Sequence, residues 1–235
     1  MTPPDDSVIA ALAQVPTGVL ADVLYEMGLK HQVVSAELRP LSQDVSFVGR
    51  AVCVAGRSEA DATAMSSPLA TMFDVDAVVA AGSVVVVDAG DHRVGATIGG
   101  LVARTFKKAG AVGFVTDGGV RDRAELMEMG LPSVARFVTP RAAKGVWAVT
   151  AVGGPVTLPG QAGTPVAVAP GDILCCDMDG LVVVPAGVAA DVLADASKVE
   201  DAERQILKVI EAGGDRREAY RRYDRFGHIR KRYRG

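Results

Sequence analysis

Four consecutive valines at positions 84–87 constrain the fold of this chain more than any other feature. A strand with β-branched apolar side chains on both faces cannot turn either face to water, so both faces must be covered. Strands of this kind are typical of parallel sheets with helices packed against them. The run therefore predicts a fully buried strand over residues 83–87 of an α/β protein.

Predicted helices and strands alternate on either side of this run, as in α/β proteins. The predicted helices cover residues 8–28 (two short helices, the second capped by Thr17 and ended by Gly28), 62–80, 101–109, 123–129 and about 188–212. The other predicted strands cover residues 49–56 and 111–116, with short β-rich pieces over 153–168 and 171–185. Since no repeat or flexible linker divides them, we expect one α/β domain over residues 1–214 and a basic tail over 215–235.

Charge is distributed unevenly along the chain. The 235 residues include 25 Lys and Arg and 28 Asp and Glu, a net charge of −3. Residues 215–235 hold nine Lys or Arg and three Asp or Glu, so the tail carries +6 and the rest of the chain −9. Tyr220, Tyr223, Phe226 and Tyr233 lie among these arginines, a combination found in RNA-binding segments. The acidic body disfavours nucleic-acid binding and favours a tail that packs on its own or a neighbouring subunit.

Cysteine and histidine are too scarce and too scattered for a zinc site or a disulfide framework. These residues are Cys53, Cys175, Cys176, His31, His92 and His228. Any metal site would therefore use carboxylates. The unpaired cysteines fit a reducing cytoplasm, and no apolar run approaches the roughly 20 residues of a membrane span. The first 14 residues do not resemble a signal peptide, so we expect a cytoplasmic protein without a membrane segment.

The segment 117–122 is the first candidate for a binding site. It reads Asp-Gly-Gly-Val-Arg-Asp, and it is predicted to be a turn between a strand and a helix. Glycines let a backbone approach a ligand closely, Arg121 offers a planar donor pair to a carboxylate, and Asp122 suits a hard cation such as Mg²⁺. The structural alternative is that Asp122 caps the following helix while Arg121 faces water.

Two other parts of the chain could form either a binding site or an ordinary structural element. Residues 90–93 and 95–101 could form an anion cradle at a helix N-terminus, or a surface loop. The glycine spacing does not fit a dinucleotide-binding motif, which disfavours a nicotinamide cofactor. Asp172, Asp177 and Asp179 could form a metal cage, although Asp-Gly at a strand junction is also ordinary hairpin chemistry and the hairpin is favoured.

Several ordered stretches together resemble the RraA-like family. They are residues 17–24 with Gly28, 49–52, 82–88, 99–101, 113–122, 130–132, and 170–172 with 177–185. The family includes class II pyruvate aldolases that act on 4-hydroxy-4-methyl-2-oxoglutarate and 4-carboxy-4-hydroxy-2-oxoadipate, and also the regulator of ribonuclease activity A. The resemblance implies a compact α/β domain of the swivelling β/β/α type. It also implies a homotrimer, or a homohexamer of two trimers, with active sites between subunits.

The resemblance assigns roles to residues of the first two candidate segments. Arg121 would bind the carboxylate and oxo group of pyruvate, and Asp122 would hold Mg²⁺ or Mn²⁺. The backbone that helps to hold the substrate carboxylate would be that of Gly99, Gly100 and Leu101. Aldolases of the family usually carry an acidic residue where this chain has Gly100, and its carboxylate helps to bind the water shell of the metal.

The resemblance also places a glutamate from the C-terminal helix of a neighbouring subunit close to the water on the metal. In this chain that residue would be Glu200 or Glu203. A metal-polarised 2-oxo acid could undergo retro-aldol cleavage, or decarboxylation if it is oxaloacetate, and either reaction releases pyruvate. We therefore expect a divalent-metal-dependent lyase acting on a small 2-oxo acid. The alternative is a non-catalytic module that binds a ribonuclease, and the presence of Asp122 favours the enzyme.

Overall fold

In the computed structural model, the valine run forms the fully buried strand β3 (Ser83–Asp88), as predicted. This strand lies in the middle of a nine-stranded sheet. The structure describes residues 4–63, 70–231 and 233. Along the sheet the order is β1 (Arg39–Pro40), β6 (Ser133–Val138), β5 (Gly113–Val120), β3, β2 (Phe47–Ser58), β10 (Ile173–Asp177) and β11 (Gly180–Val184). Strand β4 (Ala96–Ile98) pairs with β5, and β7 (Trp147–Val152) pairs with β2. Strands β8 (Val156–Leu158) and β9 (Val166–Val168) form a separate antiparallel pair.

The sheet is mixed and curls into a nearly closed barrel. Strand β3 runs parallel to β2 and β5, and β5 runs parallel to β6 and β4, whereas β10, β11 and β7 add antiparallel pairs. The segment before β1 links the two edges. The amide of Val34 donates to Leu181 O and the amide of Val183 donates to Gln32 O, each at 2.9 Å, and the same segment then continues into β1 beside β6.

Consecutive valines of β3 pack on opposite faces of the sheet. Val84 and Val86 belong to a core cluster with Phe47 and residues of β8 and β9. Val85 and Val87 belong to a second cluster, together with Phe106 and other residues of the helices that cover this face. Because side chains alternate along a strand, the four valines enter two different cores. This burial on both faces explains why positions 84–87 hold only apolar residues.

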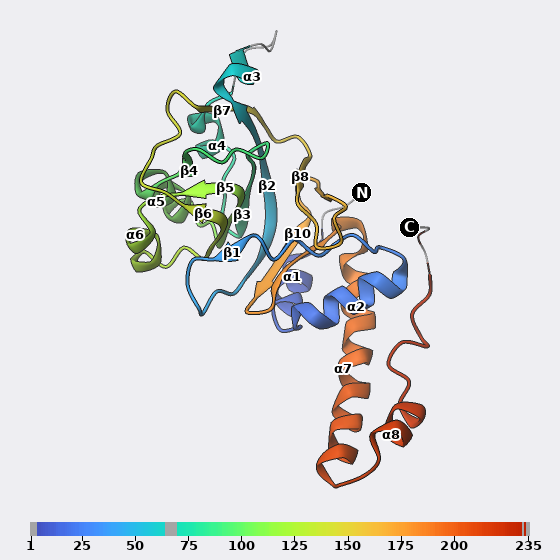
Figure 1. The fold of residues 1–235 in the computed structure, drawn as a ribbon. Coiled ribbons are helices and arrows are strands. Elements are labelled where there is room, and N and C mark those ends of the chain that lie inside the picture. The colour runs from blue at the N-terminus through green and yellow to red at the C-terminus, as the bar shows by residue number, and fades with distance from the viewer. Residues whose placement is uncertain (1–3, 64–69, 232, 234–235) are drawn as a thin grey trace.

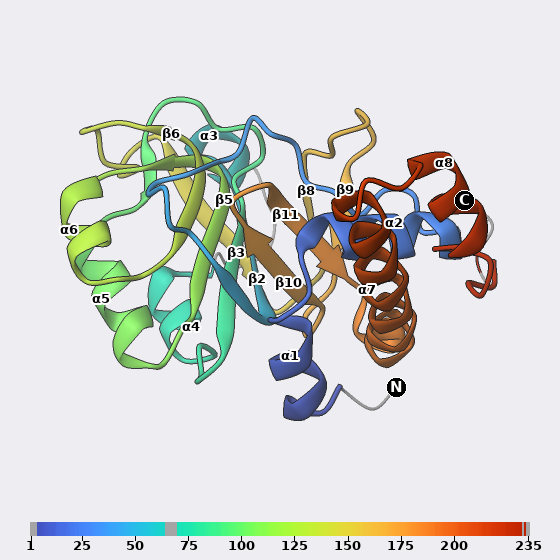
Figure 2. The same cartoon turned by 90° about the horizontal axis from the view of Figure 1, so that it is seen from below.

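Helices cover the barrel in two separate groups (Figures 1 and 2). The first group is α4 (Met72–Asp76), α5 (Gly100–Lys108) and α6 (Arg123–Glu128), on the side of β5 and β6. The second group is α1 (Asp6–Leu12), α2 (Thr17–Met27) and the long helix α7 (Ala189–Glu211), packed beside β10 and β11. The remaining short helices are α3 (Glu59–Thr63), the 3₁₀ turn η1 (Ala186–Val188) and α8 (Arg216–Arg222).

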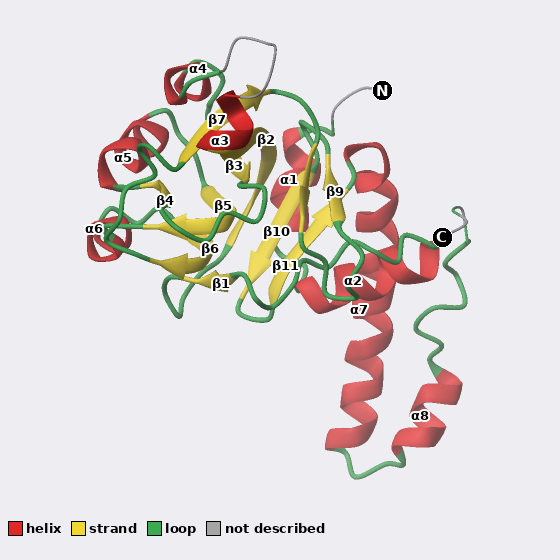
Figure 3. Cartoon of the chain, turned by 45° about the horizontal axis from the view of Figure 1, so that its top comes forward, coloured by secondary structure: helices red, strands yellow, loops and turns green. Residues whose placement is uncertain are grey.

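Most predicted elements are confirmed, including the two N-terminal helices, α5, α6, α7 and the C-terminal strands (Figure 3). Thr17 is not a cap residue, because Pro16 holds that position and Thr17 is the first helical residue. Gly28 ends α2 in the left-handed conformation, with φ 98°, as expected. The helix predicted over residues 62–80 is reduced to the end of α3 and to α4, and residues 64–69 lie outside the described part.

The tail contains a helix that the sequence analysis did not predict. Helix α8 follows α7 after a short turn, and the chain then returns along α7 towards α2 (Figure 1). Arg225 pairs with Asp22 at 2.9 Å, and the amide of Tyr233 donates to Met27 O at 3.1 Å. The tail thus packs on α2 and α7 of its own chain, where Arg225 also lies 3.0 Å from Glu203.

No single helix in the described residues is long and apolar enough to cross a membrane. Helices α1 and α2 reach that length and composition together, but they are bent by 112° at the break between them.

Candidate functional site

The glycines of the candidate segment lie inside a strand, so the prediction of a turn over residues 117–122 is wrong. Strand β5 runs on to Val120 and shifts its register against β6 between Thr116 and Gly119. A Cβ atom on Gly118 would lie 2.8 Å from the Ala89 side chain, and one on Gly119 would overlap the Phe137 ring. These glycines therefore allow close packing against neighbouring segments rather than a change of chain direction.

Asp117 holds the loop that follows β3 instead of facing a ligand. Its buried carboxylate accepts hydrogen bonds from the amides of Ala89 at 2.6 Å and Asp91 at 3.4 Å. Burial raises the pKa of Asp117, and the hydrogen bond from Ala89 opposes that rise. In the same loop, burial lowers the pKa of His92, whose Nε2 accepts from the amide of Gly95 at 2.8 Å. Residues 88–95 are thus fixed mainly by contacts within the fold.

Arg121 and Asp122 leave the end of β5 and reach the N-terminus of α5. Asp122 precedes α6 in the left-handed conformation, with φ 58°, which is uncommon for a residue other than glycine. Its side chain does not cap α6. Instead, Oδ2 accepts a hydrogen bond from the amide of Gly100 at 2.9 Å and lies 3.5 Å from Arg121 Nε. Asp122 therefore holds the N-cap position of α6, as the structural alternative predicted, but its carboxylate caps the neighbouring helix α5 instead of its own.

The backbone at Gly99 and Gly100 makes this approach possible. A Cβ atom on Gly99 would lie 2.7 Å from Arg121 Nε and 2.8 Å from Asp122 Oδ2. Beyond the bonded amide of Gly100, the N–H groups of Leu101 and Val102 have no hydrogen-bond partner in the described part of the chain. Unpaired amides at a helix N-terminus are natural donors to an anion. Two adjacent glycines, the Arg121 guanidinium and the Asp122 carboxylate therefore meet at the N-terminus of α5.

Both candidate side chains, Arg121 and Asp122, remain open to solvent. The side chain of Arg121 is 41% exposed and that of Asp122 is 42% exposed. A small anion could therefore contact the guanidinium and the free amides together, while a cation could contact the carboxylate. The structure brings together the predicted residues Gly99, Gly100, Leu101, Arg121 and Asp122.

One further side chain reaches this place and was missed by the sequence analysis. The carboxylate of Glu125 lies over Gly100, and its Oε1 accepts a hydrogen bond from Arg104 Nε at 2.7 Å. Glu125 stands three residues after Asp122, a spacing that puts two side chains on the same face of a helix. That spacing was the available signal, although it did not reveal the contact with α5.

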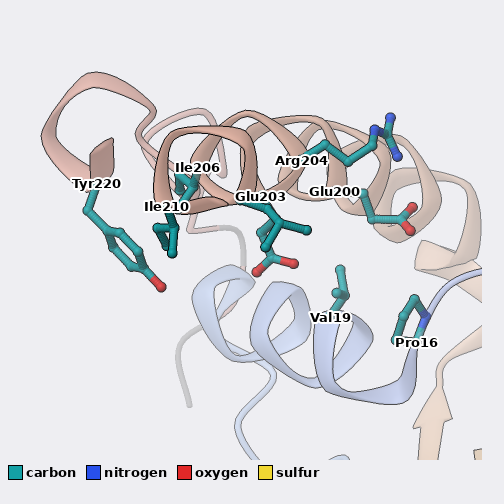
Figure 4. Close-up of a pocket in the computed structure, with 9 residues that line it drawn as sticks. Pro16, Val19, Glu200, Glu203, Arg204, Ile206, Ile210 and Tyr220 are labelled. Atoms are coloured by element: carbon teal, nitrogen blue, oxygen red, sulfur yellow. The ribbon is translucent and has the colours of Figure 1, made fainter. Parts of the chain in front are cut away.

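Glu200 and Glu203 do not join this place within one chain. Both lie on α7, on the opposite side of the barrel from α5 and α6 (Figures 1 and 2). They line a groove of about 420 Å³ between α2, α7 and α8 (Figure 4). Glu203 points towards α2, where its Oε1 lies 3.0 Å from Arg225 Nε. Among the described residues, Glu200 has no hydrogen-bond or ion-pair partner.

The three C-terminal aspartates serve the hairpin between β10 and β11 and the nearby helices. Asp177 accepts hydrogen bonds from the Thr17 amide at 2.8 Å, the Thr17 hydroxyl at 2.6 Å and the Asp179 amide at 2.9 Å. Asp172 accepts from the amides of Ala169 and Ala186, each at 2.9 Å. The hairpin interpretation is therefore correct. In the described part of the chain, no three His, Cys, Asp or Glu residues are grouped to hold a metal ion.

The fold is that of a mixed α/β protein with a nearly closed barrel. Its open polar site lies at the N-terminus of α5, where Arg121 and Asp122 meet. The RraA-like family, described as Aldolase/RraA, matches residues 17–183. A protein of Halalkalibacterium halodurans named "Putative 4-hydroxy-4-methyl-2-oxoglutarate aldolase" is 30% identical over 190 residues, which cover 81% of this chain and 82% of the relative. The chain belongs to the RraA-like family, as its sequence motifs indicated.

Solved structures agree with this assignment. An uncharacterized protein from Pseudomonas syringae pv. tomato is 25% identical, with a TM-score of 0.77 over 93% of this chain and 99% of the other. Streptomyces coelicolor RraAS2, described as an unusual member of the RNase ES inhibitor RraA protein family, is 26% identical, with a TM-score of 0.75. That match covers 87% of this chain and 97% of RraAS2. The relatives of this chain are therefore named in two ways, as an aldolase and as a ribonuclease inhibitor.

Proposed function

We propose that this chain is a divalent-metal-dependent carbon–carbon lyase that releases pyruvate from a 2-oxo acid. The substrate would be 4-hydroxy-4-methyl-2-oxoglutarate or a related 4-hydroxy-2-oxo diacid, or oxaloacetate. The observation that carries the proposal is the position of Arg121 beside Asp122 at the N-terminus of α5. Membership of the RraA-like family and the name of the Halalkalibacterium relative support the same reaction class.

Arg121 would bind the substrate carboxylate through its planar donor pair. The free amides of Leu101 and Val102 would donate to the same group from the end of α5. When the C3–C4 bond of the substrate breaks, negative charge develops on the former 2-oxo oxygen, next to the Arg121 guanidinium. A donor that is already in place at such a position stabilises the transition state without reorganisation.

The side chains at this place fit a hard divalent cation. Asp122 keeps Oδ1 free of partners among the described residues, while Oδ2 is fixed by the Gly100 amide. Mg²⁺ and Mn²⁺ prefer oxygen ligands, and Mg²⁺ usually keeps several waters and takes one or two protein carboxylates. Asp122 would therefore hold the ion, which, when bound, would polarise the 2-oxo group of the substrate.

A second subunit would complete the site. We propose a homotrimer, or a homohexamer of two trimers, in which α7 of one subunit approaches α5 and α6 of the next. Glu200 is the better placed of the two predicted glutamates, because Glu203 already faces Arg225 of its own chain. We also propose a cytoplasmic location, since Cys53, Cys175 and Cys176 are all free thiols.

Purified protein incubated with oxaloacetate or 4-hydroxy-4-methyl-2-oxoglutarate tests this function. We expect pyruvate release with Mg²⁺ or Mn²⁺, its loss on chelation with EDTA, and its return when the metal is added back. The Asp122→Ala variant should remain folded and lose the metal-dependent rate. Undiminished turnover in that variant would contradict the proposed site.

The alternative function is a non-catalytic module that binds a ribonuclease. It is supported by the likeness to RraAS2 and by the apolar groove beside α7, where Leu207 and Ile210 are exposed. Specific binding of a ribonuclease together with no turnover and no metal affinity would favour this function over the lyase.

A further inference from the structure

Helix α8 carries four arginines whose side chains form no hydrogen bond or ion pair with any described residue. They are Arg216, Arg217, Arg221 and Arg222, and all four are exposed. The helix holds one acidic residue, Glu218, which pairs with none of them in the described part of the chain. Four arginines and one glutamate give α8 a net charge of +3.

Packing of the tail on its own chain uses a different arginine. Arg225 pairs with Asp22 and Glu203, and these contacts include no arginine of α8. The two other carboxylates of the tail stabilise local turns, because Asp215 accepts from an amide in the first turn of α8 and Asp224 accepts from the amides that follow it. The charge of α8 therefore has no counter-charge among the described residues, and an anionic partner would supply one.

A hollow of about 400 Å³ lies on one face of α8. It is lined by Arg216, Arg217, Tyr220 and Arg221, which share that face because residues four apart in a helix lie one above the other. The Tyr220 side chain is 47% exposed. The guanidinium carbons of Arg216 and Arg225 lie 5.8 Å and 5.9 Å from the centre of its ring. The hollow thus combines planar cations with an accessible aromatic ring.

We propose that this face of α8 binds single-stranded nucleic acid. A guanidinium can donate two parallel hydrogen bonds to one phosphate group, and the Tyr220 ring offers a surface on which a base can stack. A membrane fits less well, because α8 contains no Leu, Ile, Val, Met, Phe or Trp that could enter the lipid. An acidic protein surface would use the arginines but would have no need of the exposed ring.

The acidic body of the chain has little effect at this face. Helix α8 lies beside the end of α7 that points away from the barrel (Figures 1 and 3). With 23 residues, α7 is about 35 Å long, whereas charges are screened over about 8 Å at physiological ionic strength. The last two turns of α7 hold Arg204, Lys208 and Glu211, a net charge of +1. The net charge of −9 on residues 1–214 therefore does not describe the surroundings of α8.

Fluorescence anisotropy with a labelled oligouridylate of about 12 nucleotides tests the proposal on the full chain. The variant is Arg217→Gln with Arg221→Gln. The matched control, Arg141→Gln with Lys144→Gln, removes the same two charges from exposed positions between β6 and β7. At about 0.15 M KCl we expect the α8 variant to bind roughly 10-fold more weakly and the control to bind like the unmodified protein. The affinity of the α8 variant should also depend less on salt, because two phosphate contacts are lost.

Substitutions of Tyr220 separate base stacking from charge. Tyr220→Phe keeps the ring and should bind the oligouridylate like the unmodified protein. Tyr220→Leu keeps an apolar side chain beside α7 without a ring, and we expect it to bind roughly 10-fold more weakly. Thermal unfolding should give the same melting temperature for both variants. Equal affinities of the two variants for the oligouridylate would overturn the proposal.

Other partners of α8 would give different results. Inorganic polyphosphate at the same phosphate concentration is the competitor without bases, and equal competition would overturn the proposal because it would show binding by charge alone. If the unmodified protein binds neither oligouridylate nor oligothymidylate, the proposal is also wrong. In that case, a weaker trimer or hexamer in the Arg217→Gln and Arg221→Gln variant, measured by sedimentation, would identify a second copy of the chain as the partner. Pyruvate release plays no part in these measurements, so their outcome is independent of the lyase function.

Discussion

The carboxylate of Asp122 accepts a hydrogen bond from the backbone amide of Gly100 at 2.9 Å, so the aspartate before one helix caps the next. This bond joins the ends of two parallel-strand units, because Gly100 follows β4 and Asp122 follows β5. It fixes Oδ2, which also lies 3.5 Å from Arg121 Nε, and leaves Oδ1 without a partner among the described residues. The proposed chemistry depends on this arrangement.

Arg121→Lys tests the planar donor pair. A lysine keeps the positive charge but offers a compact ammonium group without the two parallel donors of a guanidinium. We expect kcat/KM for pyruvate release to fall roughly 100-fold, the usual loss for one transition-state donor. Arg93→Lys is the control, since Arg93 is exposed and pairs with Asp91. An unchanged rate in Arg121→Lys would remove this residue from the proposed mechanism.

Mixing two inactive variants tests whether α7 completes the site of a neighbouring subunit. Glu200→Gln and Asp122→Asn should each lose most of the pyruvate-releasing activity. When the two are unfolded together and refolded as mixed oligomers, some sites will combine an intact Asp122 with an intact Glu200. We expect activity to reappear in the mixture and not in either variant alone. A mixture that stays inactive would contradict a shared site.

Glu203→Gln is the matched variant for this comparison. Because Glu203 faces Arg225, we expect it to change stability more than turnover. Thermal unfolding and steady-state rates of both glutamate variants would show the contrast. A larger loss of turnover in Glu203→Gln than in Glu200→Gln would mean that Glu203, and not Glu200, completes the neighbouring site.

Arg225 connects the tail to both N-terminal and C-terminal helices. Its side chain is 19% exposed, pairs with Asp22 of α2 and Glu203 of α7, and lies over the Phe226 ring at 4.4 Å. The contact with Glu203 lacks hydrogen-bond geometry, so much of its effect is electrostatic. We expect Arg225→Gln to lower the free energy of unfolding by about 1 kcal/mol, measured by urea denaturation.

Arg217→Gln is the control for that variant, because the side chain of this exposed arginine makes no hydrogen bond or ion pair among the described residues, and its loss should be neutral. Deleting residues after Gly214 should have a larger effect and weaken the proposed trimer or hexamer, measured by sedimentation. An unchanged oligomer would contradict a role of the tail in assembly.

Asp177 should make stability depend on pH. Burial alone would raise the pKa of Asp177, but hydrogen bonds from Thr17, Asp179 and Gly180 outweigh it and leave the pKa below its ordinary value. Since the unfolded pKa is about 3.9, this contribution is present above that pH and is lost as the pH falls through the folded pKa. Asp177→Asn should therefore cost about 1 kcal/mol near neutral pH and progressively less as the pH falls below about 4, measured by urea unfolding. A cost that does not change with pH would contradict this account.

The sequence by itself determined much of the local structure. The valine run required a strand covered on both faces, Gly28 ended α2, and Arg121 and Asp122 were recognised as a chemical pair. Periodicity, capping and the chemistry of neighbouring residues are local properties, so they can be read without the fold. The ordered motifs also indicated the family.

Only the tertiary structure decided which distant groups meet. Gly118 and Gly119 are strand residues because Ala89 and Phe137 pack against them, although their sequence resembles a turn. Asp177 binds Thr17, 160 positions away, rather than a metal. Asp122 and Glu125 reach α5 because parallel strands place the two helix ends side by side. Contacts of this kind depend on packing between segments that are far apart in the sequence, so local sequence patterns do not reveal them.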